Sequence, residues 1–254
     1  MISILPRVRN LTRGAIAMAI RAVLFDLGNT LVAYYAAPDF PAVLRRCMGQ
    51  CMAAVGVSPS QVDEDDLFAR AKRLNTERED HAVRLLSDRL QELLGRYAVL
   101  DGPKLDAACK AFLKPIFELA RPDPEAIPLL ESLRRRGIRT GIVSNTPWDS
   151  PATAWRQELA RRGLLERVDA AVFCVDVGWR KPHPAAFARA LNVLSIAPGQ
   201  AIFVGDDPRW DVVGARRAGL CPVLLSSASA VVVDGCTIIR SLREVLRLVD
   251  EAAG

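Results

Sequence analysis

Short apolar runs and stretches with helical hydrophobic spacing divide the chain into two kinds of segment. Residues 23–25 form an unbroken apolar run that leads directly into Asp26 and a Gly-Asn-Thr turn. An apolar run of this length bounded by turn residues is typical of a strand that is buried on both faces of a sheet. Open α/β sheets bind their ligands at the carboxyl ends of such strands. Asp26 therefore lies where a functional residue is expected.

From about residue 33 to residue 120 the apolar positions recur every three or four residues, which predicts helices and no strand. Breaks between the helices are expected at residues 56–59 and 100–103. One helix is predicted to begin at Pro59-Ser60. Its first turn would hold four acidic residues, which favour the helix dipole and are not interpreted as a metal site. These are Asp63, Glu64, Asp65 and Asp66.

After residue 120 the predicted strands and helices alternate, which implies a parallel, doubly wound α/β sheet with right-handed connections. We expect a Rossmann-like core formed by residues 18–32 and 121–254, with an inserted all-α domain of residues 33–120. A last amphipathic helix is predicted to be capped by Ser241. The strands are predicted at 138–143, 170–175, 201–204 and 222–225, and the helices at 124–136, 153–162, 184–191 and 212–218.

Length and composition exclude several classes of protein. The chain has 254 residues, of which half are hydrophobic and a quarter are charged, and it can bury a sizeable core. The net charge of +5 is spread along helical segments, so no nucleic-acid partner is expected. No apolar run approaches the roughly eighteen residues of a transmembrane helix, so no membrane partner is expected either.

The cysteines and histidines do not follow a metal-binding pattern. The six cysteines contain no C-x-x-C pair and the two histidines lie far apart, which argues against zinc. Cys47 and Cys51 share a helix face and are expected to pack, and Cys174 and Cys221 look like small core residues. We expect a reduced, cytoplasmic protein. The sequence leaves a homodimer open.

The first seventeen residues differ from the rest of the chain. They carry Arg7, Arg9 and Arg13 but no long apolar centre and no small-residue cleavage pattern, which fits a secretory signal poorly. Met18 restarts the chain just before the first strand. We interpret residues 1–17 as an N-terminal extension, either a loosely held tail or a segment upstream of the true start.

Polar residues cluster where the predicted strands end. Asp26 follows the first strand, Ser144 and Asn145 follow the second, Lys181 lies in the loop after the third, and Asp206 follows the fourth. Because the carboxyl ends of parallel strands meet at one edge of the sheet, these side chains are expected to lie close together. Each has an ordinary interpretation by itself: Ser144 and Asn145 as a helix N-cap, Lys181 as a solvent-exposed lysine, and Asp26 and Asp206 as turn residues. Their occurrence together favours a functional site.

With these motifs the chain resembles the haloacid dehalogenase-like (HAD) hydrolase superfamily, which consists mostly of phosphatases. The resemblance covers nearly all of residues 19–250, including the place of the helical insert. It rests on four motifs in the family's order, of which any one alone would be weak. They are FDLGNTL at 25–31, IVSNT at 142–146, GWRKPHP at 178–184, and VGDDPRWD at 204–211 followed by Gly214-Ala215 and Ala218-Gly219.

The resemblance implies a catalytic role for two residues. Asp26 matches the family's nucleophile, which attacks phosphorus and forms a phosphoaspartate, splitting one displacement into two easier ones. Lys181 matches the residue that neutralises the nucleophile and the transferring phosphoryl oxygens. Ser144 and the backbone N–H of Asn145 would bind a phosphoryl oxygen of a small phosphorylated substrate.

The resemblance also implies Mg²⁺, which would offset the repulsion between an anionic nucleophile and an anionic phosphoester. Asp206 and Asp211 are hard oxygen donors of the kind that Mg²⁺ prefers. With them, Asp26 and the backbone carbonyl of Gly28 would complete the protein's ligands. Asp211 has a second interpretation as an acidic residue at a helix start.

Gly28 is a departure from the family's pattern. Phosphatases of the family usually have a second Asp at this position, which protonates the leaving oxygen and later deprotonates the attacking water. Gly28 keeps the carbonyl and lacks the carboxyl group, whose contribution is about 10²–10⁴-fold in rate. Asp39 and Asp149 are candidate replacements, without geometric support from the sequence.

Three functions are compatible with this departure. The first is a phosphatase that turns over slowly or uses substrates with good leaving groups, such as acyl phosphates. The second is a 2-haloacid dehalogenase, which needs no acid because halide leaves unaided. Dehalogenases of that type lack the metal pair, so Asp206 and Asp211 favour the phosphatase. The third is a binding or regulatory protein that keeps the phosphate site and little catalysis.

Several neighbouring residues receive weaker interpretations. Asp207 is expected to turn outward or to help orient Lys181, and His183 to be a loop residue without a catalytic part. Trp148 and Asp149 could contact substrate or support a loop. The helical insert is expected to act as a cap that excludes water and selects the substrate. Candidate selecting residues are Tyr34, Tyr35 and Phe40.

Overall fold

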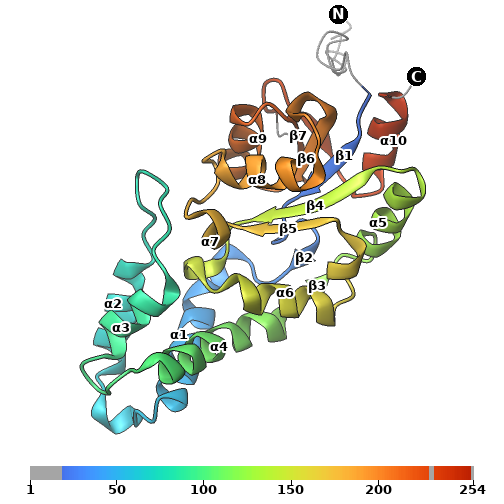
Figure 1. Ribbon diagram of the computed structural model, residues 1–254. Coiled ribbons are helices and arrows are strands. Elements are labelled where there is room, and N and C mark those ends of the chain that lie inside the picture. The colour runs from blue at the N-terminus through green and yellow to red at the C-terminus, as the bar shows by residue number, and fades with distance from the viewer. Residues whose placement is uncertain (1–18, 229–231, 253–254) are drawn as a thin grey trace, which may run out of the picture.

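A computed structural model describes residues 19–228 and 232–252; the predicted extension, residues 1–17, and Met18 lie outside these ranges. Six parallel strands form the central sheet, in the order β5-β4-β1-β6-β7-β8 (Figure 1). β1 lies in the middle, where Phe25 aligns with Ile142 on one side and with Val204 on the other. The strands are β1 (Ala22–Phe25), β4 (Arg139–Ser144), β5 (Ala170–Phe173), β6 (Ala201–Gly205), β7 (Cys221–Leu225) and β8 (Thr237–Ile239). The predicted doubly wound parallel sheet is confirmed.

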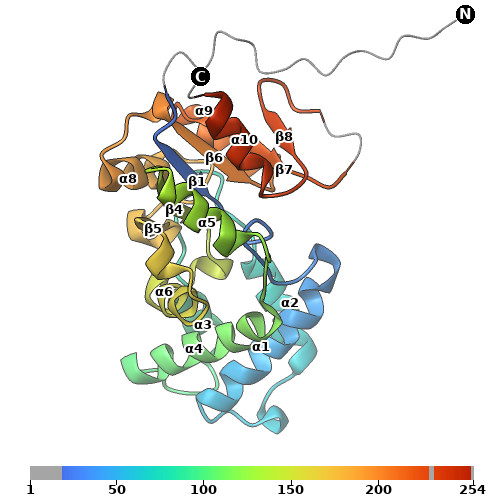
Figure 2. The ribbon, with the colours of Figure 1, turned by 90° about the vertical axis from the view of Figure 1, so that its right-hand side faces the viewer.

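Helices cover both faces of this sheet, because successive residues of a buried strand point to opposite faces. Leu24 belongs to the core on one face, together with residues of α8 (Ala185–Leu194) and α9 (Val213–Arg217). Phe25 belongs to the core on the other face, with α5 (Ala126–Arg135), α6 (Ala152–Arg161) and α10 (Glu244–Glu251). Figure 2 shows α5 and α10 on one side of the sheet.

The helical insert, residues 40–119, extends away from one end of the sheet (Figures 1 and 2). Its long helices α1 and α4 lie side by side, and the Cys51 thiol on α1 donates a hydrogen bond to the Ala108 carbonyl on α4 at 3.3 Å. The helices are α1 (Phe40–Ala54), α2 (Glu64–Leu74), α3 (Leu86–Leu94) and α4 (Gly102–Leu119).

The chain enters and leaves the insert through two paired segments that the sequence did not predict. β2 (Val32–Ala33) runs antiparallel to β3 (Arg121–Pro122). Two residues are too short to display the alternation by which a strand is recognised. The pairing depends on segments that are about ninety positions apart in the sequence. It therefore becomes visible only in the folded chain.

Several predicted boundaries were wrong at the ends of helices. α2 begins at Glu64 and not at Pro59, because the Asp63 side chain caps it by accepting the backbone N–H groups of Asp65 and Asp66. α10 begins at Glu244 and Ser241 is not its cap. The predicted strand 170–175 ends at Phe173, where the short helix α7 (Cys174–Val177) starts. The remaining short turns are Ala37–Asp39, Pro59–Gln61, Pro147–Asp149, Leu165–Arg167, Pro198–Gln200 and Pro208–Val212.

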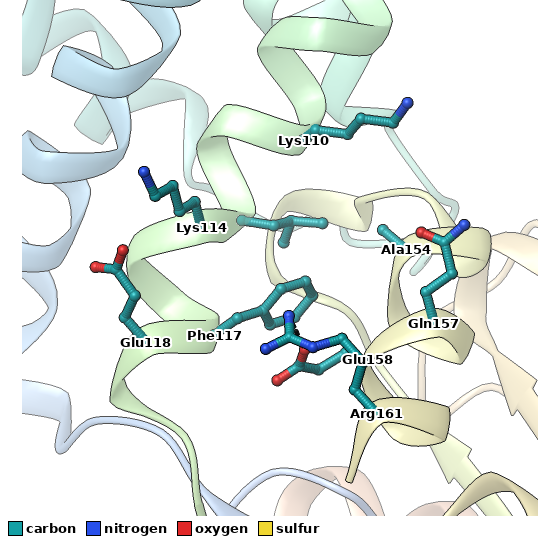
Figure 3. A pocket seen from close by; sticks show the side chains of 9 residues that line it. Lys110, Lys114, Phe117, Glu118, Ala154, Gln157, Glu158 and Arg161 are labelled. Atoms are coloured by element: carbon teal, nitrogen blue, oxygen red, sulfur yellow. Dashed lines mark ion pairs between the residues drawn. The ribbon is translucent and has the colours of Figure 1, made fainter.

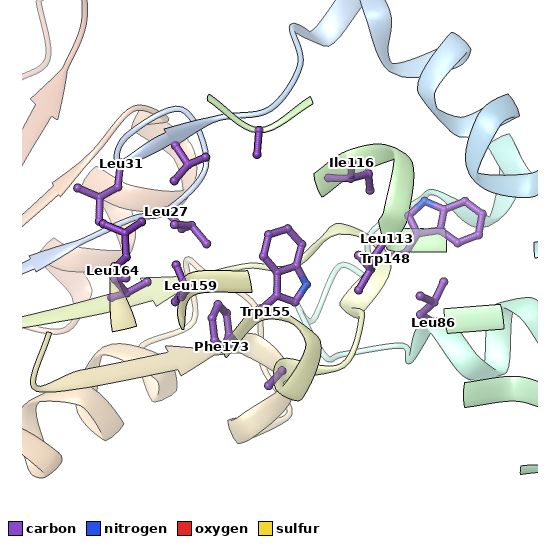
Figure 4. Close-up of a cluster of buried hydrophobic side chains, with 14 of the residues drawn as sticks. Leu27, Leu31, Leu86, Leu113, Ile116, Trp148, Trp155, Leu159, Leu164 and Phe173 are labelled. Carbon is purple, nitrogen blue, oxygen red and sulfur yellow. The ribbon is translucent and has the colours of Figure 1, made fainter. Parts of the chain in front are cut away.

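One hydrophobic core continues from the sheet into the insert. Trp155 on α6 lies between Phe173 of β5 and Phe117 of α4, with ring centroids 6.4 and 4.9 Å away. Figure 4 shows this cluster reaching from Leu27 to the insert. The Cys47 and Cys51 side chains are buried on α1, as predicted. Among the described residues, no helix combines the length and hydrophobicity needed to cross a bilayer.

Candidate active site

Three carboxylates meet at the carboxyl edge of the sheet. Asp26 directly follows β1 and Asp206 directly follows β6, and these two strands are paired neighbours. Asp211 comes from the turn Pro208–Val212 that follows. One oxygen from each side chain lies within 4.8 Å of the others. The topology therefore brings together three of the predicted residues that are up to 185 positions apart.

Lys181 places its ammonium group among these carboxylates. The Nζ atom donates to Oδ1 of Asp211 at 2.6 Å and also to Oδ1 of Asp26. The lysine is buried, and burial works against its charged form. The carboxylates of Asp211 and Asp26 outweigh that effect and raise the lysine's pKa above its ordinary value. Lys181 is therefore a permanent cation in this structure.

The carboxylates still repel one another. Burial, followed by the charges of Asp26 and Asp211, raises the pKa of Asp206 to about 7. Burial also raises the pKa of Asp211, against the opposing effect of Lys181. The three carboxylates are hard oxygen donors, and with one ammonium group beside them the cluster keeps a surplus of negative charge, which suits a divalent cation such as Mg²⁺. The residues present thus fit the metal that the family resemblance implies.

Gly205 permits the close approach of Asp211. A Cβ atom built on Gly205 would lie 2.2 Å from Oδ2 of Asp211, so any side chain here would displace that carboxylate. The same Oδ2 accepts the backbone N–H of Asp207 at 3.0 Å. The Asp207 side chain binds Arg209 and does not reach Lys181. Of its two predicted roles, turning outward is confirmed.

Asn145 holds the backbone of Lys181. Its Oδ1 accepts the Lys181 N–H at 2.8 Å and its Nδ2 donates to the Lys181 carbonyl at 3.3 Å. The sequence reasoning missed this contact, because it assigned Asn145 a backbone role only. Ser144 is the last residue of β4, and its hydroxyl donates to the Asn145 carbonyl at 3.1 Å. Neither residue caps a helix, since α6 begins after Pro151.

Gly28 lies in a tight turn beside the nucleophile position. The Asn29 N–H donates to the Val32 carbonyl at 2.8 Å, and Asn29 has a φ of 57°, in the left-handed region that Asn tolerates. Among the described residues other than its two chain neighbours, none places an atom within 4 Å of a Cβ built on Gly28. A side chain would therefore fit where the family usually has Asp.

Neither candidate replacement is placed as a proton donor. Asp39 is exposed at the N-terminus of α1. Asp149 is buried, and both of its oxygens accept hydrogen bonds from arginine residues. Trp148 and Asp149 have φ values of 53° and 51°, which cost roughly 1–3 kcal/mol each and persist only where surrounding contacts enforce them. Both residues therefore support the loop, which was one of the two roles predicted for them.

The remaining aromatic and groove residues lie outside the carboxylate cluster. The His183 ring stacks on Trp179, with centroids 4.5 Å apart, as a loop residue would. A groove of about 430 Å³ lies between α4 and α6 (Figure 3). Its lining includes Lys110, Lys114 and Arg161, and none of the predicted site residues.

A parallel sheet whose central strands end in carboxylates around a buried lysine defines a Rossmann-like α/β enzyme. The family model described as haloacid dehalogenase-like hydrolase matches residues 20–219. The chain belongs to this family and is a hydrolase, which confirms the resemblance drawn from the four motifs.

Curated relatives cover most of the chain. A glyceraldehyde 3-phosphate phosphatase of Methanopyrus kandleri is 30% identical over 80% of this chain and 83% of its own. A phosphoglycolate phosphatase of Rhodospirillum rubrum is 31% identical over 81% and 79%. Among solved structures, a HAD phosphatase from Thermococcus onnurineus has a TM-score of 0.66 at 24% identity, covering 90% of this chain and 97% of its own. A 2-haloacid dehalogenase from Pseudomonas syringae has a TM-score of 0.63 at 23% identity, covering 91% and 99%. The structural likenesses establish the fold, which both activities share.

Proposed function

We propose that this hydrolase is a Mg²⁺-dependent phosphatase that cleaves a small phosphorylated metabolite through a phosphoaspartate on Asp26. The observation that carries the proposal is the bridge from Lys181 to both Asp26 and Asp211, with Asp206 in the same cluster. Dehalogenases of the family lack the metal pair. Three clustered carboxylates therefore favour phosphoryl transfer.

Asp26 is the proposed nucleophile. One of its carboxylate oxygens attacks phosphorus, an O–P bond forms, and the bond from phosphorus to the substrate's alcohol oxygen breaks. The leaving oxygen takes a proton from solvent. Water then attacks the same phosphorus and gives a proton to solvent, which releases inorganic phosphate and regenerates the Asp26 carboxylate. The ammonium group of Lys181 lies against the Asp26 carboxylate and stabilises negative charge on the transferring oxygens. The Ser144 hydroxyl and the Asn145 N–H are proposed to bind a phosphoryl oxygen.

The metal ligands are proposed to be Asp26, Asp206, Asp211 and the backbone carbonyl of Gly28. A bound Mg²⁺ supplies positive charge that offsets the repulsion between a carboxylate and a phosphoester. A bound cation would also offset the charges of Asp26 and Asp211, which add to burial in raising the pKa of Asp206. The donor set supports this assignment through its hard oxygen chemistry and its surplus negative charge.

Gly28 determines which substrates react fast. With no carboxyl group at this position, the departing oxygen leaves without a protein acid beside it. We propose that turnover depends strongly on the leaving group, with acyl and aryl phosphates cleaved faster than alkyl phosphates. The helical insert is proposed to act as the cap that covers the site, with Tyr34, Tyr35 and Phe40 among the residues that shape it.

A phosphomonoester panel with and without Mg²⁺ tests this function. It would contain glyceraldehyde 3-phosphate, phosphoglycolate and N-acetylmuramic acid 6-phosphate, which occur in the names of relatives, together with acetyl phosphate and p-nitrophenyl phosphate. We expect phosphate release that needs Mg²⁺ and is lost in Asp26→Asn. The control is Asp106→Asn, since the exposed Asp106 side chain pairs with Lys110 on the same helix, α4, away from the carboxylate cluster.

Two other outcomes would replace the proposal. Mg²⁺-independent release of halide from a 2-haloacid would make the protein a dehalogenase. Binding of Mg²⁺ and inorganic phosphate without turnover of any panel member would make it a phosphate-binding or regulatory protein. Gly28 is the feature that favours this last alternative, because it removes the acid/base group and leaves the metal site intact.

We also propose a reducing, cytoplasmic location. All six cysteines are free thiols, and four of them are buried in the core. In an oxidising compartment, such thiols could form non-native disulfides whenever the chain unfolds.

A further inference from the structure

Asp149 is the centre of a buried ionic cluster that joins the helical insert to the core. Its side chain is 0% exposed, and it comes from the turn that follows β4. Oδ2 accepts the backbone N–H of Arg84 at 2.9 Å and an Arg89 N–H at 3.4 Å. Oδ1 accepts from Arg180, whose next residue is Lys181. Arg84 and Arg89 belong to the insert, so one carboxylate binds both parts of the chain.

Arg180 also contacts both parts of the chain, the core through Asp149 and the insert through the contacts that follow. Its second terminal nitrogen donates to Glu77 of the insert at 3.0 Å. Its backbone N–H donates to the His81 carbonyl at 2.8 Å, and the Val83 N–H donates to the Gly178 carbonyl at 3.0 Å. The insert segment 77–83 thus lies along residues 178–180 with both side-chain and main-chain contacts.

Docking of the insert adds ionic partners to a pair that the core forms by itself, Asp149 with Arg180. Asp149 and Glu77 supply two negative charges, and Arg89 and Arg180 supply two positive ones. If the insert moved away, Asp149 would lose Arg89 and the Arg84 N–H, and Arg180 would lose Glu77. Asp149 and Arg180 would keep each other, but each would lose a charged partner that docking supplies, which is unfavourable for buried ionic groups. The network therefore favours the docked position of the insert.

We propose that this cluster is a latch through which docking of the insert positions Lys181. Arg180 adjoins the lysine in the chain and is fixed by the insert at its side chain and its backbone. On the core side, Lys181 itself is fixed by Asn145. Undocking removes the insert's contacts to Arg180 and leaves those to Asp149 and the Thr146 carbonyl, and the loop that carries Lys181 then becomes more mobile. Arg89, Glu77 and Asp149 are positioning residues in this scheme and do not touch the substrate. The consequence for turnover rests on the proposed function, whereas the latch itself does not.

Hydrogen exchange at individual amides tests the latch without any assay of activity. The variants are Arg89→Met and Glu77→Gln, and the control is Arg78→Met. Arg78 lies in the same insert segment, is 58% exposed, and pairs with Asp80 of that segment. The amides of Val83 and Arg180 report docking, since each donates across the interface. The amide of Lys181 reports the position of the lysine, since it donates to Asn145.

We expect exchange at all three amides to become faster by roughly tenfold or more in both variants and to stay unchanged in the control. Arg89→Lys, which keeps the positive charge, should restore part of the protection. Faster exchange at Val83 and Arg180 with unchanged exchange at Lys181 would overturn the positioning role. Unchanged exchange at all three would overturn the latch.

Kinetics supply a separate readout. In Glu77→Gln we expect kcat to fall several-fold more than KM changes, because the substrate's own contacts remain. A lower free energy of unfolding in Glu77→Gln with an unchanged kcat would mean that the cluster is structural only. If the wild-type protein releases no phosphate from any substrate, the proposed function fails, and the exchange experiment still decides the latch.

Discussion

The side chain of Asn145 binds both main-chain groups of Lys181, through Oδ1 to the N–H at 2.8 Å and through Nδ2 to the carbonyl at 3.3 Å. An amide side chain has one acceptor and one donor group in the geometry needed for such a pair. The contact ties the end of β4 to the loop that carries the buried ammonium group. The direction of the Lys181 side chain toward Asp26 therefore depends on Asn145.

Replacing Asn145 should affect both stability and turnover. In Asn145→Ala, both main-chain groups of Lys181 lose their partner, and we expect the free energy of unfolding to fall by about 1–3 kcal/mol. We expect kcat to fall about tenfold, because the lysine's position is less well defined. Urea unfolding and phosphate release measure the two effects. Asn192→Ala, at an exposed position of α8, should change neither. If the free energy of unfolding falls as predicted while kcat stays at the wild-type value, Asn145 does not position Lys181 for catalysis.

Gly28→Asp should raise turnover of alkyl phosphates. The position has room for a side chain, and its backbone conformation is one that any residue can adopt. A carboxyl group there could protonate the leaving oxygen, so we expect an increase of up to about 10²–10⁴-fold for alkyl phosphates and little change for acetyl phosphate. The measurement is a plot of log kcat/KM against the pKa of the leaving group. The slope of this plot should become flatter in Gly28→Asp.

The matched control for this change is Gly28→Asn, which adds a side chain of similar size without an acidic proton. It should keep the steep dependence on the leaving group. Equal rates in the Asp and Asn variants would show that the missing carboxyl group does not limit turnover. A loss of folding in both would show that the turn needs glycine.

Gly205→Ala should weaken metal binding. The new Cβ would lie 2.2 Å from Oδ2 of Asp211 and would force that carboxylate away from Asp26 and Lys181. We expect the apparent affinity for Mg²⁺ to fall by about tenfold or more, measured by titrating the thermal shift with Mg²⁺. Gly199→Ala is the control, because nothing lies within 4 Å of a Cβ at that position. Unchanged Mg²⁺ affinity in Gly205→Ala would argue against Asp211 as a ligand.

The buried thiols make stability fall in alkaline solution. Burial raises the pKa of the Cys47 thiol to about 12 and that of Cys109 to about 11. The folded protein therefore keeps these protons above pH 9, where the unfolded chain releases them. Stability is fully present below about pH 9 and falls as the pH rises toward the folded values, by up to about 1.4 kcal/mol per pH unit for each thiol.

Urea unfolding between pH 8 and pH 11 measures this slope. In Cys47→Ala we expect a shallower slope above pH 9, on top of a lower overall stability from the lost packing. The native protein should also react slowly with a thiol reagent at pH 8, and all six thiols should react in denaturant. A slope that does not change in Cys47→Ala would show that this thiol ionises freely in the folded state.

The sheet and the carboxylate cluster could be predicted because their signals are local. An apolar run that ends in Asp26, and another that ends before Asp206, each indicate a strand and the polar residue at its end. The rule that parallel strands share one carboxyl edge then places the two residues together. Asp211 and Lys181 were implied by the resemblance of their motifs to those of the family. Helix boundaries such as that of α2 were missed by a few residues, because capping by Asp63 competes with the apparent start at Pro59.

The remaining contacts depend on which distant surfaces meet, and no local pattern encodes them. The pairing of Asp149 with Arg89 joins residues 60 positions apart, and the contact of Glu77 with Arg180 joins residues 103 apart. The charges of these residues are visible in the chain, but exposed and buried arginines look the same there. By itself the sequence determined the sheet and the family, since these follow from period and motif, and it supplied the residues of the proposed site. Only the tertiary structure decided how Lys181 is held and how the insert is joined to it, because those contacts form between surfaces that the fold brings together.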